Sequence, residues 1–213
     1  LGTSTLESTG RDIEFGDNID YLYTSSYSGG FKKRYSSNGS VARAYSSIDQ
    51  SQDSAMKHTI GPGGDFAYVA GNSGSLSKVN LETDTVEWTY SSSATSDPAE
   101  VVYVNGLVVY TVGGAGTFAV DASDGSEAWT ISTSGGGITT DGEVIYIDDD
   151  STNELVEISA SDGSELNRVS VGDIWSLEYG GGTIYAGTSS SVEAIDTESF
   201  GVVDSITKSA RVE

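Results

Sequence analysis

Few side chains in this sequence could take part in catalysis or in binding a metal. The chain has one His and no Cys, which excludes disulfides, thiolate metal sites and a Cys nucleophile. His58 lies in the segment Ala-Met-Lys-His-Thr-Ile, and the chain contains no Gly-x-Ser-x-Gly motif. We therefore expect His58 to have a structural role rather than to belong to a Ser-His-Asp triad.

The densest group of oxygen ligands is the acidic run from Asp148 to Glu154. Carboxylates and an Asn within seven residues could bind Ca²⁺ through oxygen, with Asp148, Asp150 and Asn153 as ligands. The run lacks the Gly and terminal Glu of an EF-hand loop. We expect a hydrated surface loop with no cofactor, and a weak Ca²⁺ site is the alternative.

The charge balance limits the partners. Thirty-two acidic residues against ten Lys and Arg make a formal net charge of −22, which repels nucleic acid and anionic membranes. Molar salt shortens the Debye length to about 3 Å and screens that repulsion. The composition resembles that of haloarchaeal and haloarchaeal-virus proteins, and an acidic secreted protein from a mesophile is the alternative. No apolar run approaches the ~18 residues of a membrane-spanning helix, so we expect no membrane insertion.

An internal repeat in the sequence predicts the strands on which these candidate residues lie. Five short strands each end in a Tyr followed by small residues, at steps of 45, 42, 36 and 39 residues: Tyr23, Tyr68, Tyr110, Tyr146 and Tyr185. A period of about 40 residues with β content indicates propeller blades. Around each anchor, one strand precedes it and two follow, separated by turns such as Ser-Asp-Gly.

The sequence thus predicts an all-β fold, a β-propeller of about five four-stranded antiparallel blades. Strands this short bury their faces only when sheets stack radially. We expect a single domain over residues 1–213. The expected blades are 11–45, 56–90, 100–131, 137–169 and 174–206, and the ends 1–10 and 207–213 are candidates for closing the ring.

The third unit reads AVDASDGSEAW and resembles the tryptophan-docking repeat of propellers of the pyrroloquinoline-quinone (PQQ) type. All four fixed positions of the pattern Ala-x-Asp-x-x-x-Gly-x-x-x-Trp match, at Ala119, Asp121, Gly125 and Trp129. The second unit keeps the spacing and ends in Trp88, whereas the first matches only in its strand pattern. The resemblance implies that both Trp side chains lie flat on the neighbouring blade and that the Asp and Gly shape the hairpin.

The same resemblance says little about chemistry. PQQ dehydrogenases have longer chains, eight blades and a calcium site, and many have a vicinal disulfide beside the cofactor. This chain has no Cys and about five expected blades, so it departs from the enzymes in the features that support their catalysis. The non-catalytic relatives use the propeller as an assembly platform. We therefore expect a non-enzymatic module, because fold alone does not specify function.

Several other side chains are candidates for contact with a ligand or partner. We expect Trp175 to pack in the core near the channel, with ligand stacking as the alternative. A basic cluster, Lys32-Lys33-Arg34, should alternate along an exposed strand and could meet an acidic partner. A lectin-like propeller would stack sugars on aromatic side chains, and the candidates are Tyr27, Tyr90 and Tyr179.

The favoured function is a binding or scaffolding module on a cell or virion surface, attached to protein partners or to the host surface in high salt. We expect it outside the cell, in the cell envelope or on a virion, alone, as a homo-oligomer or in a larger assembly. Asn38-Gly39-Ser40 forms a glycosylation sequon that fits such a surface. A carbohydrate-binding propeller that recognises cell-surface glycan is the alternative, and a small hydrolase using His58 or acids near Asp148 is less favoured.

Overall fold

The computed structural model describes residues 10–15, 20–26, 30–48, 55–71 and 74–207. These residues form five four-stranded antiparallel sheets, which we call blades 1 to 5 in chain order, and one short 3-10 turn at Pro62–Gly64. The predicted all-β fold with five blades is confirmed. No helix in the described ranges is long and apolar enough to cross a membrane.

Each blade is an up-and-down meander whose strands follow chain order. Blade 1 contains β1 (Gly10–Phe15), β2 (Tyr21–Ser26), β3 (Gly30–Tyr35) and β4 (Val41–Tyr45). Blade 2 contains β5 (Ala55–Ile60), β6 (Phe66–Gly71), β7 (Ser75–Asn80) and β8 (Thr85–Ser91). Blade 3 contains β9 (Pro98–Val104), β10 (Leu107–Val112), β11 (Gly116–Asp121) and β12 (Glu127–Ile131).

The last two blades repeat the same order. Blade 4 contains β13 (Ile138–Thr140), β14 (Val144–Asp149), β15 (Glu154–Ser159) and β16 (Glu165–Ser170). Blade 5 contains β17 (Ile174–Gly180), β18 (Thr183–Thr188), β19 (Ser191–Asp196) and β20 (Gly201–Thr207). The boundaries expected from the sequence differ from these by at most two residues, because turn residues and alternating strands mark them clearly.

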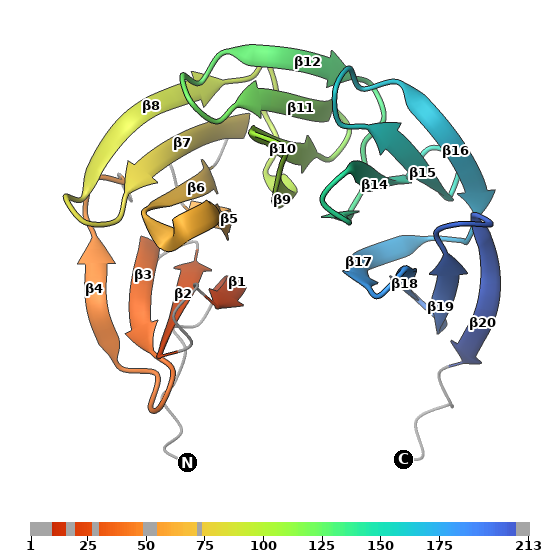
Figure 1. Ribbon diagram of the computed structural model, residues 1–213, viewed down its shortest axis with the longest axis horizontal. Coiled ribbons are helices and arrows are strands. Elements are labelled where there is room, and N and C mark those ends of the chain that lie inside the picture. Colours follow the sequence, from red (N-terminus) through yellow and green to blue (C-terminus); the bar gives the residue numbers. More distant parts are fainter. Residues whose placement is uncertain (1–9, 16–19, 27–29, 49–54, 72–73, 208–213) are drawn as a thin grey trace.

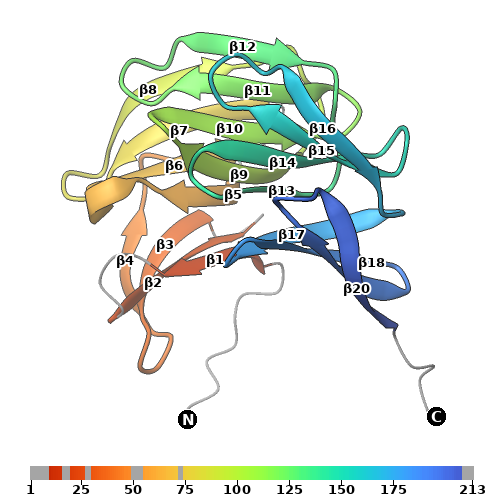
Figure 2. The same cartoon turned by 45° about the vertical axis from the view of Figure 1, so that its right-hand side comes forward.

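The blades follow an open arc (Figure 1). The first strand of each blade lies toward the centre and the fourth lies on the rim, as the turned view also shows (Figure 2). Blades 1 and 5 lie at the two ends of the arc with an opening between them. The segments 1–9 and 208–213, which we expected to help close the ring, lie outside the described residues.

The hydrophobic core lies between blades rather than within them. Four clusters of buried side chains join blade 1 to 2, 2 to 3, 3 to 4 and 4 to 5. Of the anchor tyrosines, Tyr23, Tyr68 and Tyr146 contribute to the cluster shared with the following blade. Tyr110 contributes to the cluster with the preceding blade, because it is the fourth residue of β10, whereas the others are the third residue of their strands. Tyr110 is therefore shifted by one residue relative to the other anchor tyrosines, and its side chain points to the opposite face of its blade.

Candidate functional site

The inner strands of all five blades surround a central hollow of about 420 Å³. Its wall includes the carboxylates of Asp12, Glu14, Glu100 and Glu178, together with His58. A wall rich in carboxylates could in principle provide a general acid and a general base, so the partners of each group decide what it can do.

His58 is fully enclosed between blades 1 and 2. Its Nδ1 lies 3.1 Å from Ser25 Oγ and 3.3 Å from Asp12 Oδ2, and its backbone N–H donates to the same Asp12 oxygen at 3.0 Å. A Ser-His-Asp triad needs the Ser and the Asp on opposite ring nitrogens, but here both lie beside Nδ1. Burial lowers the pKa of His58 to about 4, although Asp12 opposes this shift. The contact therefore joins two blades and does not form a proton relay.

The other channel acids also connect neighbouring inner strands. Glu14 Oε2 on β1 accepts the backbone N–H of Ile60 on β5 at 3.0 Å, and Lys57 on β5 donates to Glu100 Oε2 on β9 at 2.8 Å. Burial raises the pKa of Glu14 to about 8, against the hydrogen bond from Ile60. Burial also raises the pKa of Glu100, against the charge of Lys57. Glu14 is therefore protonated at neutral pH, and both acids hold the wall of the hollow together.

The residues of the tryptophan motif mediate contacts between blades. Trp88 of blade 2 donates from Nε1 to the carbonyl oxygen of Ala122 in blade 3 at 3.3 Å, and its ring lies against Gly125. Trp129 of blade 3 donates to Ala160 O in blade 4 at 2.9 Å, and its ring lies against Gly163. A side chain at either Gly would meet the indole within about 2.8 Å. The Trp and Gly sizes are therefore matched across each interface.

Within blade 3, the remaining motif residues shape the strand pair and its turn. Ala119 is fully buried and pairs with Trp129 across β11 and β12. Asp121 Oδ1 accepts the backbone N–H of Ser123 at 2.7 Å, and hydrogen bonds from Ser123 hold the pKa of Asp121 below its ordinary value. Gly125 has φ of 78°, a left-handed conformation that suits Gly. These contacts make a rigid hairpin for Trp88.

The same docking position in blade 1 holds Arg43, which sequence reasoning missed. Arg43 pairs with Lys33 beside a bulge in β3 and β4, as Trp129 pairs with Ala119 beside a bulge in β11 and β12. Its Nη1 donates to Leu81 O at 2.9 Å and to Glu82 O at 2.7 Å in blade 2. The spacing Lys33, Gly39, Arg43 follows the motif, so the first unit shares more than its strand pattern.

Between blades 4 and 5 the small residue lies at the Trp position and the large residue lies at the Gly position. Asn167 holds the Trp position of blade 4, and Phe200 holds the Gly position of blade 5 with φ of 48°. The Phe200 ring packs on Tyr146 with a centroid distance of 6.3 Å. Phe200 of the following blade thus adds an aromatic ring to an interface whose Trp position holds a polar residue.

The acidic run is a solvated loop only in part: residues 150–153 are exposed in the turn between β14 and β15, whereas the expectation is wrong for Asp148 and Asp149. Asp148 and Asp149 end β14 and are buried. Asp148 Oδ2 accepts the backbone N–H of Gly136 at 3.1 Å, and burial raises the pKa of Asp148 to about 7. Arg168 Nη1 contacts Asp149 Oδ2 at 3.0 Å and also binds Glu154.

Asp150 and Asn153 lie in the turn between β14 and β15. The backbone N–H of Asn153 donates to Asp149 O at 2.8 Å. No group of three or more acidic or His side chains with metal-binding geometry occurs among the described residues. Ca²⁺ binding by Asp148, Asp150 and Asn153 stays a prediction.

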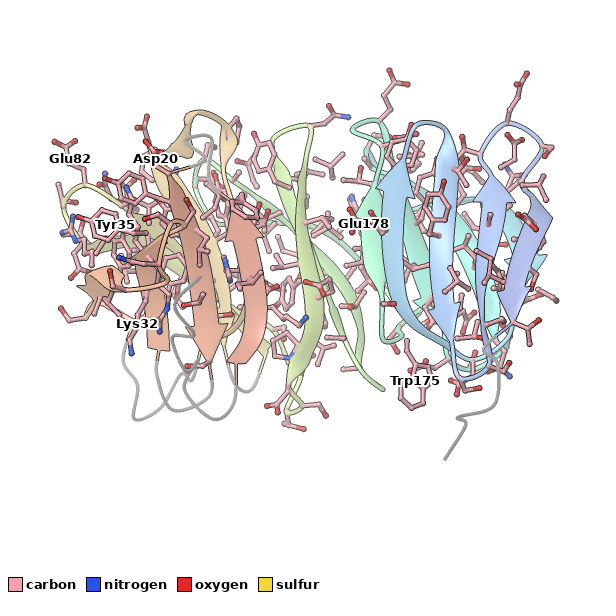
Figure 3. All side chains as sticks on the ribbon, turned by 90° about the horizontal axis from the view of Figure 1, so that it is seen from below. Asp20, Lys32, Tyr35, Glu82, Trp175 and Glu178 are labelled. Carbon is pink, nitrogen blue, oxygen red and sulfur yellow. The ribbon has the colours of Figure 1, made fainter. Side chains whose placement is uncertain are left out.

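The basic cluster is only partly exposed. Arg34 is buried at 7% exposure, donating from Nε to Thr24 Oγ1 and from Nη1 to Gly39 O, both at 3.0 Å. The expectation of an exposed strand is therefore wrong for this residue, because its guanidinium holds the hairpin. Lys33 Nζ lies 4.0 Å from the centre of the Tyr21 ring, and Lys32 is half-buried on blade 1 (Figure 3).

The aromatic candidates have different surroundings. Tyr90 donates its hydroxyl to Glu127, and Tyr179 stacks on Tyr146 at 6.4 Å, so both take part in contacts between blades. Trp175 is 68% exposed and projects from one end of blade 5 (Figure 3). The expected core packing of Trp175 is wrong, because the face of blade 5 on which it lies has no following blade in the described chain. Tyr27 lies outside the described residues.

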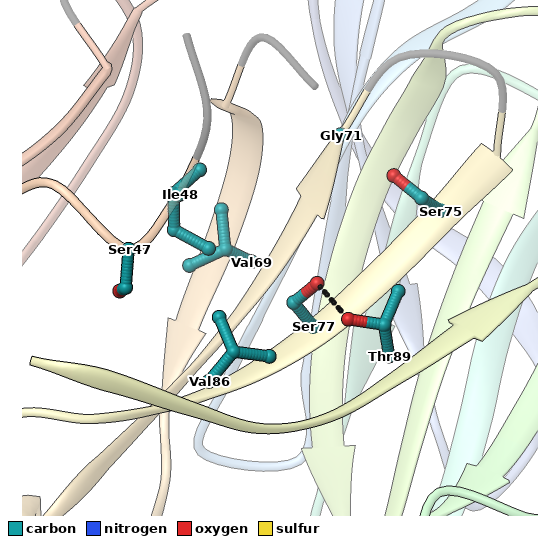
Figure 4. A pocket seen from close by; sticks show the side chains of 8 residues that line it. All are labelled: Ser47, Ile48, Val69, Gly71, Ser75, Ser77, Val86 and Thr89. Atoms are coloured by element: carbon teal, nitrogen blue, oxygen red, sulfur yellow. Dashed lines mark hydrogen bonds between the residues drawn. The ribbon is translucent and has the colours of Figure 1, made fainter. Parts of the chain in front are cut away.

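Asn38 lies exposed in the turn between β3 and β4, and its Oδ1 accepts the backbone N–H of Ser40 at 2.9 Å. A separate small pocket of about 90 Å³ lies between blades 1 and 2. Its lining includes hydroxyls, and Ser77 Oγ lies 3.0 Å from Thr89 Oγ1 (Figure 4). The pocket is well below the ~300 Å³ at which ligand pockets begin, so it suits water better than a substrate.

Comparison with known proteins agrees with this architecture. A family model described as outer membrane protein assembly factor BamB matches residues 39–169 and 72–206. The chain belongs to this family. A BamB crystal structure from Moraxella catarrhalis superposes with a TM-score of 0.72 at 18% sequence identity. The match covers 92% of this chain and 61% of that one, so this BamB-family chain spans less than two thirds of that relative's length. No curated protein sequence matches the chain.

Proposed function

We propose that this chain is a non-catalytic protein-binding module that holds partner proteins in an assembly. Membership of a family described as an outer membrane protein assembly factor carries the proposal. That role is printed for the named protein and is extended to this chain as a proposal. The engagement of Trp88, Trp129 and Arg43 between blades supports a platform, because these motif residues serve packing rather than a reaction.

A groove of about 320 Å³ between blades 3 and 4 is the proposed contact position for a partner. Leu107, Val144 and Leu166 supply its apolar lining, and Leu166 is 49% exposed. Glu143 and Asn105 add polar groups to the same lining. An apolar centre with polar groups beside it suits the insertion of one partner side chain.

The proposed setting is outside the cell, in the cell envelope or on a virion, in high salt. The net charge of −22 supports a salty medium, because self-repulsion between so many carboxylates is screened there. Attachment to a host surface is the finer form of the same proposal.

The test begins with affinity capture from an envelope or virion fraction, followed by calorimetry with the purified partner. We expect Leu166→Glu to weaken binding at least about tenfold, because it places a charge in the groove. Thr130→Glu adds the same charge on an exposed position of β12 and should bind like the wild type. No reproducible partner, or equal binding by Leu166→Glu, contradicts the proposal. Glycoside hydrolysis that is lost in Glu14→Gln would instead favour the hydrolase.

A further inference from the structure

Asn38 lies in a turn that occurs, with nearly the same residues, in three of the five blades. Blade 1 has Asn38-Gly39-Ser40, blade 3 has Asp124-Gly125-Ser126 and blade 4 has Asp162-Gly163-Ser164, each between its third and fourth strands. In all three, the Gly has a left-handed φ, of 70°, 78° and 73°, and its N–H donates to the carbonyl oxygen four residues earlier, at 2.7, 2.9 and 3.0 Å. The turns therefore have one backbone conformation, and blade 1 differs in its first residue, which is an amide instead of a carboxylate.

One side-chain oxygen holds the turn in all three blades. Asn38 Oδ1 accepts the backbone N–H of Ser40 at 2.9 Å. Asp124 Oδ1 and Asp162 Oδ1 each accept the backbone N–H of the Ser two residues later, at 2.9 and 3.1 Å. This kind of turn needs only the oxygen, so a carboxylate serves as well as an amide. The amide nitrogen of Asn38 is therefore not required for the fold, and none of the described residues forms a hydrogen bond with it.

The turn stays exposed even where another blade packs beside it. Trp88 of blade 2 lies against Gly125, and Trp129 of blade 3 lies against Gly163, yet the residues on both sides of each Gly are exposed. The residues on both sides of Gly39 are exposed in the same way. The exposure of the Asn38 side chain therefore follows from the turn itself and does not depend on what lies next to blade 1.

The third residue of the same turn completes an acceptor sequence for a glycan. The sequence contains seven Asn, and only Asn38 is followed two residues later by Ser or Thr. Asn-x-Ser/Thr in a surface loop of an exported protein is the sequence to which oligosaccharides are attached. The turn of blade 1 supplies an exposed amide nitrogen, a Gly that adds no side chain beside it, and the exposed Ser40.

We propose that Asn38 is an N-glycosylation site, because the turn of this repeat presents its amide nitrogen to an oligosaccharide donor linked to a lipid phosphate. Asn38 Nδ2 forms a bond to the anomeric carbon of the sugar and loses one proton, while the bond from that carbon to the phosphate breaks and the lipid phosphate leaves. Oδ1 remains an amide oxygen, so its hydrogen bond with Ser40 is kept and the glycan requires no change in the hairpin. The inference rests on the proposed setting outside the cell. The glycan on blade 1 leaves the groove beside Leu166, between blades 3 and 4, free for a partner.

Intact mass spectrometry tests the proposal on the chain exported from an archaeal host that performs N-glycosylation. A resident glycoprotein purified from the same culture verifies that the host transfers glycans. The wild type should exceed 22.1 kDa by the mass of one host oligosaccharide, with the added mass on the peptide that contains Asn38. Asn38→Asp keeps the oxygen that holds the turn but lacks the amide nitrogen, so it should be unmodified. Ser40→Ala should also be unmodified, whereas Ser40→Thr keeps the hydroxyl and should carry the glycan.

The equivalent turn of blade 3 provides a test by gain of a site. Asp124→Asn gives that turn the same three residue types as blade 1, so this variant should carry two glycans, and the double variant with Asn38→Asp should carry one. An unmodified wild type or a modified Asn38→Asp protein overturns the proposal. A single glycan on Asp124→Asn refutes the role assigned to the turn. Partner binding through Leu166 is measured on the unmodified Ser40→Ala protein, so it can fail without affecting this result.

Discussion

Arg43 donates to the carbonyl oxygen of Leu81 at 2.9 Å, from the strand position at which Trp88 and Trp129 donate to Ala122 and Ala160. Leu81, Ala122 and Ala160 hold the same place in three successive units. The first blade therefore docks on the second through a guanidinium where later blades use an indole. One backbone acceptor serves both kinds of side chain because each presents an N–H at the end of a flat group.

Arg43→Met should destabilise the protein by about 1–2 kcal/mol, since hydrogen bonds from a charged donor to two carbonyls are lost at a partly exposed site. Urea unfolding monitored by circular dichroism measures the change. Arg43→Lys should lie between Met and the wild type, because an ammonium retains the charge but not the flat guanidinium. Equal stability of all three proteins would show that the contact contributes nothing.

The Trp–Gly contact predicts a matched pair of glycine substitutions. Gly163→Ala should cost about 2–4 kcal/mol, because its φ is 73° and the new Cβ would lie 2.8 Å from the Trp129 ring. Gly114→Ala has φ of 71° and open space around the Cβ, so only the backbone cost of about 1–2 kcal/mol applies. The difference between the two unfolding free energies isolates the packing contribution. If both variants lose the same stability, Trp129 does not need the space above Gly163.

The raised pKa of Glu14 predicts that the free energy of unfolding declines as the pH rises from 6.5 to 8. Its pKa is about 8 in the folded protein and 4.5 for the free side chain, so unfolding releases a proton in this window and stability falls with pH. The expected loss is about 1.4 kcal/mol per pH unit well below pH 8 and falls to about half of that at pH 8, where Glu14 is half-protonated in the folded protein. Below pH 6.5, His58 acts in the opposite direction, because its folded pKa of about 4 makes the unfolded state bind the extra proton.

Urea unfolding of the wild type and Glu14→Gln at pH 6.5 and pH 8 tests this prediction. The amide does not titrate, so the variant should lose much less stability over the same interval. Asp20→Asn, at an exposed position on blade 1, is a control for the loss of one carboxylate and should keep the slope of the wild type. A wild type whose stability is flat from pH 6.5 to pH 8 would contradict the raised pKa of Glu14.

The net charge predicts stabilisation by salt. Raising KCl from dilute to molar concentration should increase the free energy of unfolding at neutral pH, because repulsion among the carboxylates is screened. The same titration near pH 4.1, where the net charge is close to zero, should show a smaller dependence. Thermal unfolding over a KCl series measures both slopes. Equal slopes at the two pH values would attribute the effect to something other than charge.

The strand pattern of this protein could be predicted from its sequence because turns and alternating residues are local signals. The spacing from Ala119 to Trp129 was sufficient to indicate the repeat class and the docking role of its Trp. Arg43 was missed because neither its size nor its charge resembles Trp, and only the shared acceptor position reveals the equivalence. Phe200 was missed for the same reason, since a large residue at the Gly position suggests that the fifth unit lacks this part of the motif.

The composition and the repeat by themselves determined an all-β, acidic chain of five similar units without thiol chemistry. The surroundings of individual side chains depended on the tertiary structure. Asp148 is buried and Trp175 is exposed, the reverse of what their chemical types suggest. The physical reason is that burial in a propeller is decided between blades, so a face is covered only where another blade follows. Blade 5 has no following blade in the described arc, and Trp175 and Tyr185 are exposed for that reason.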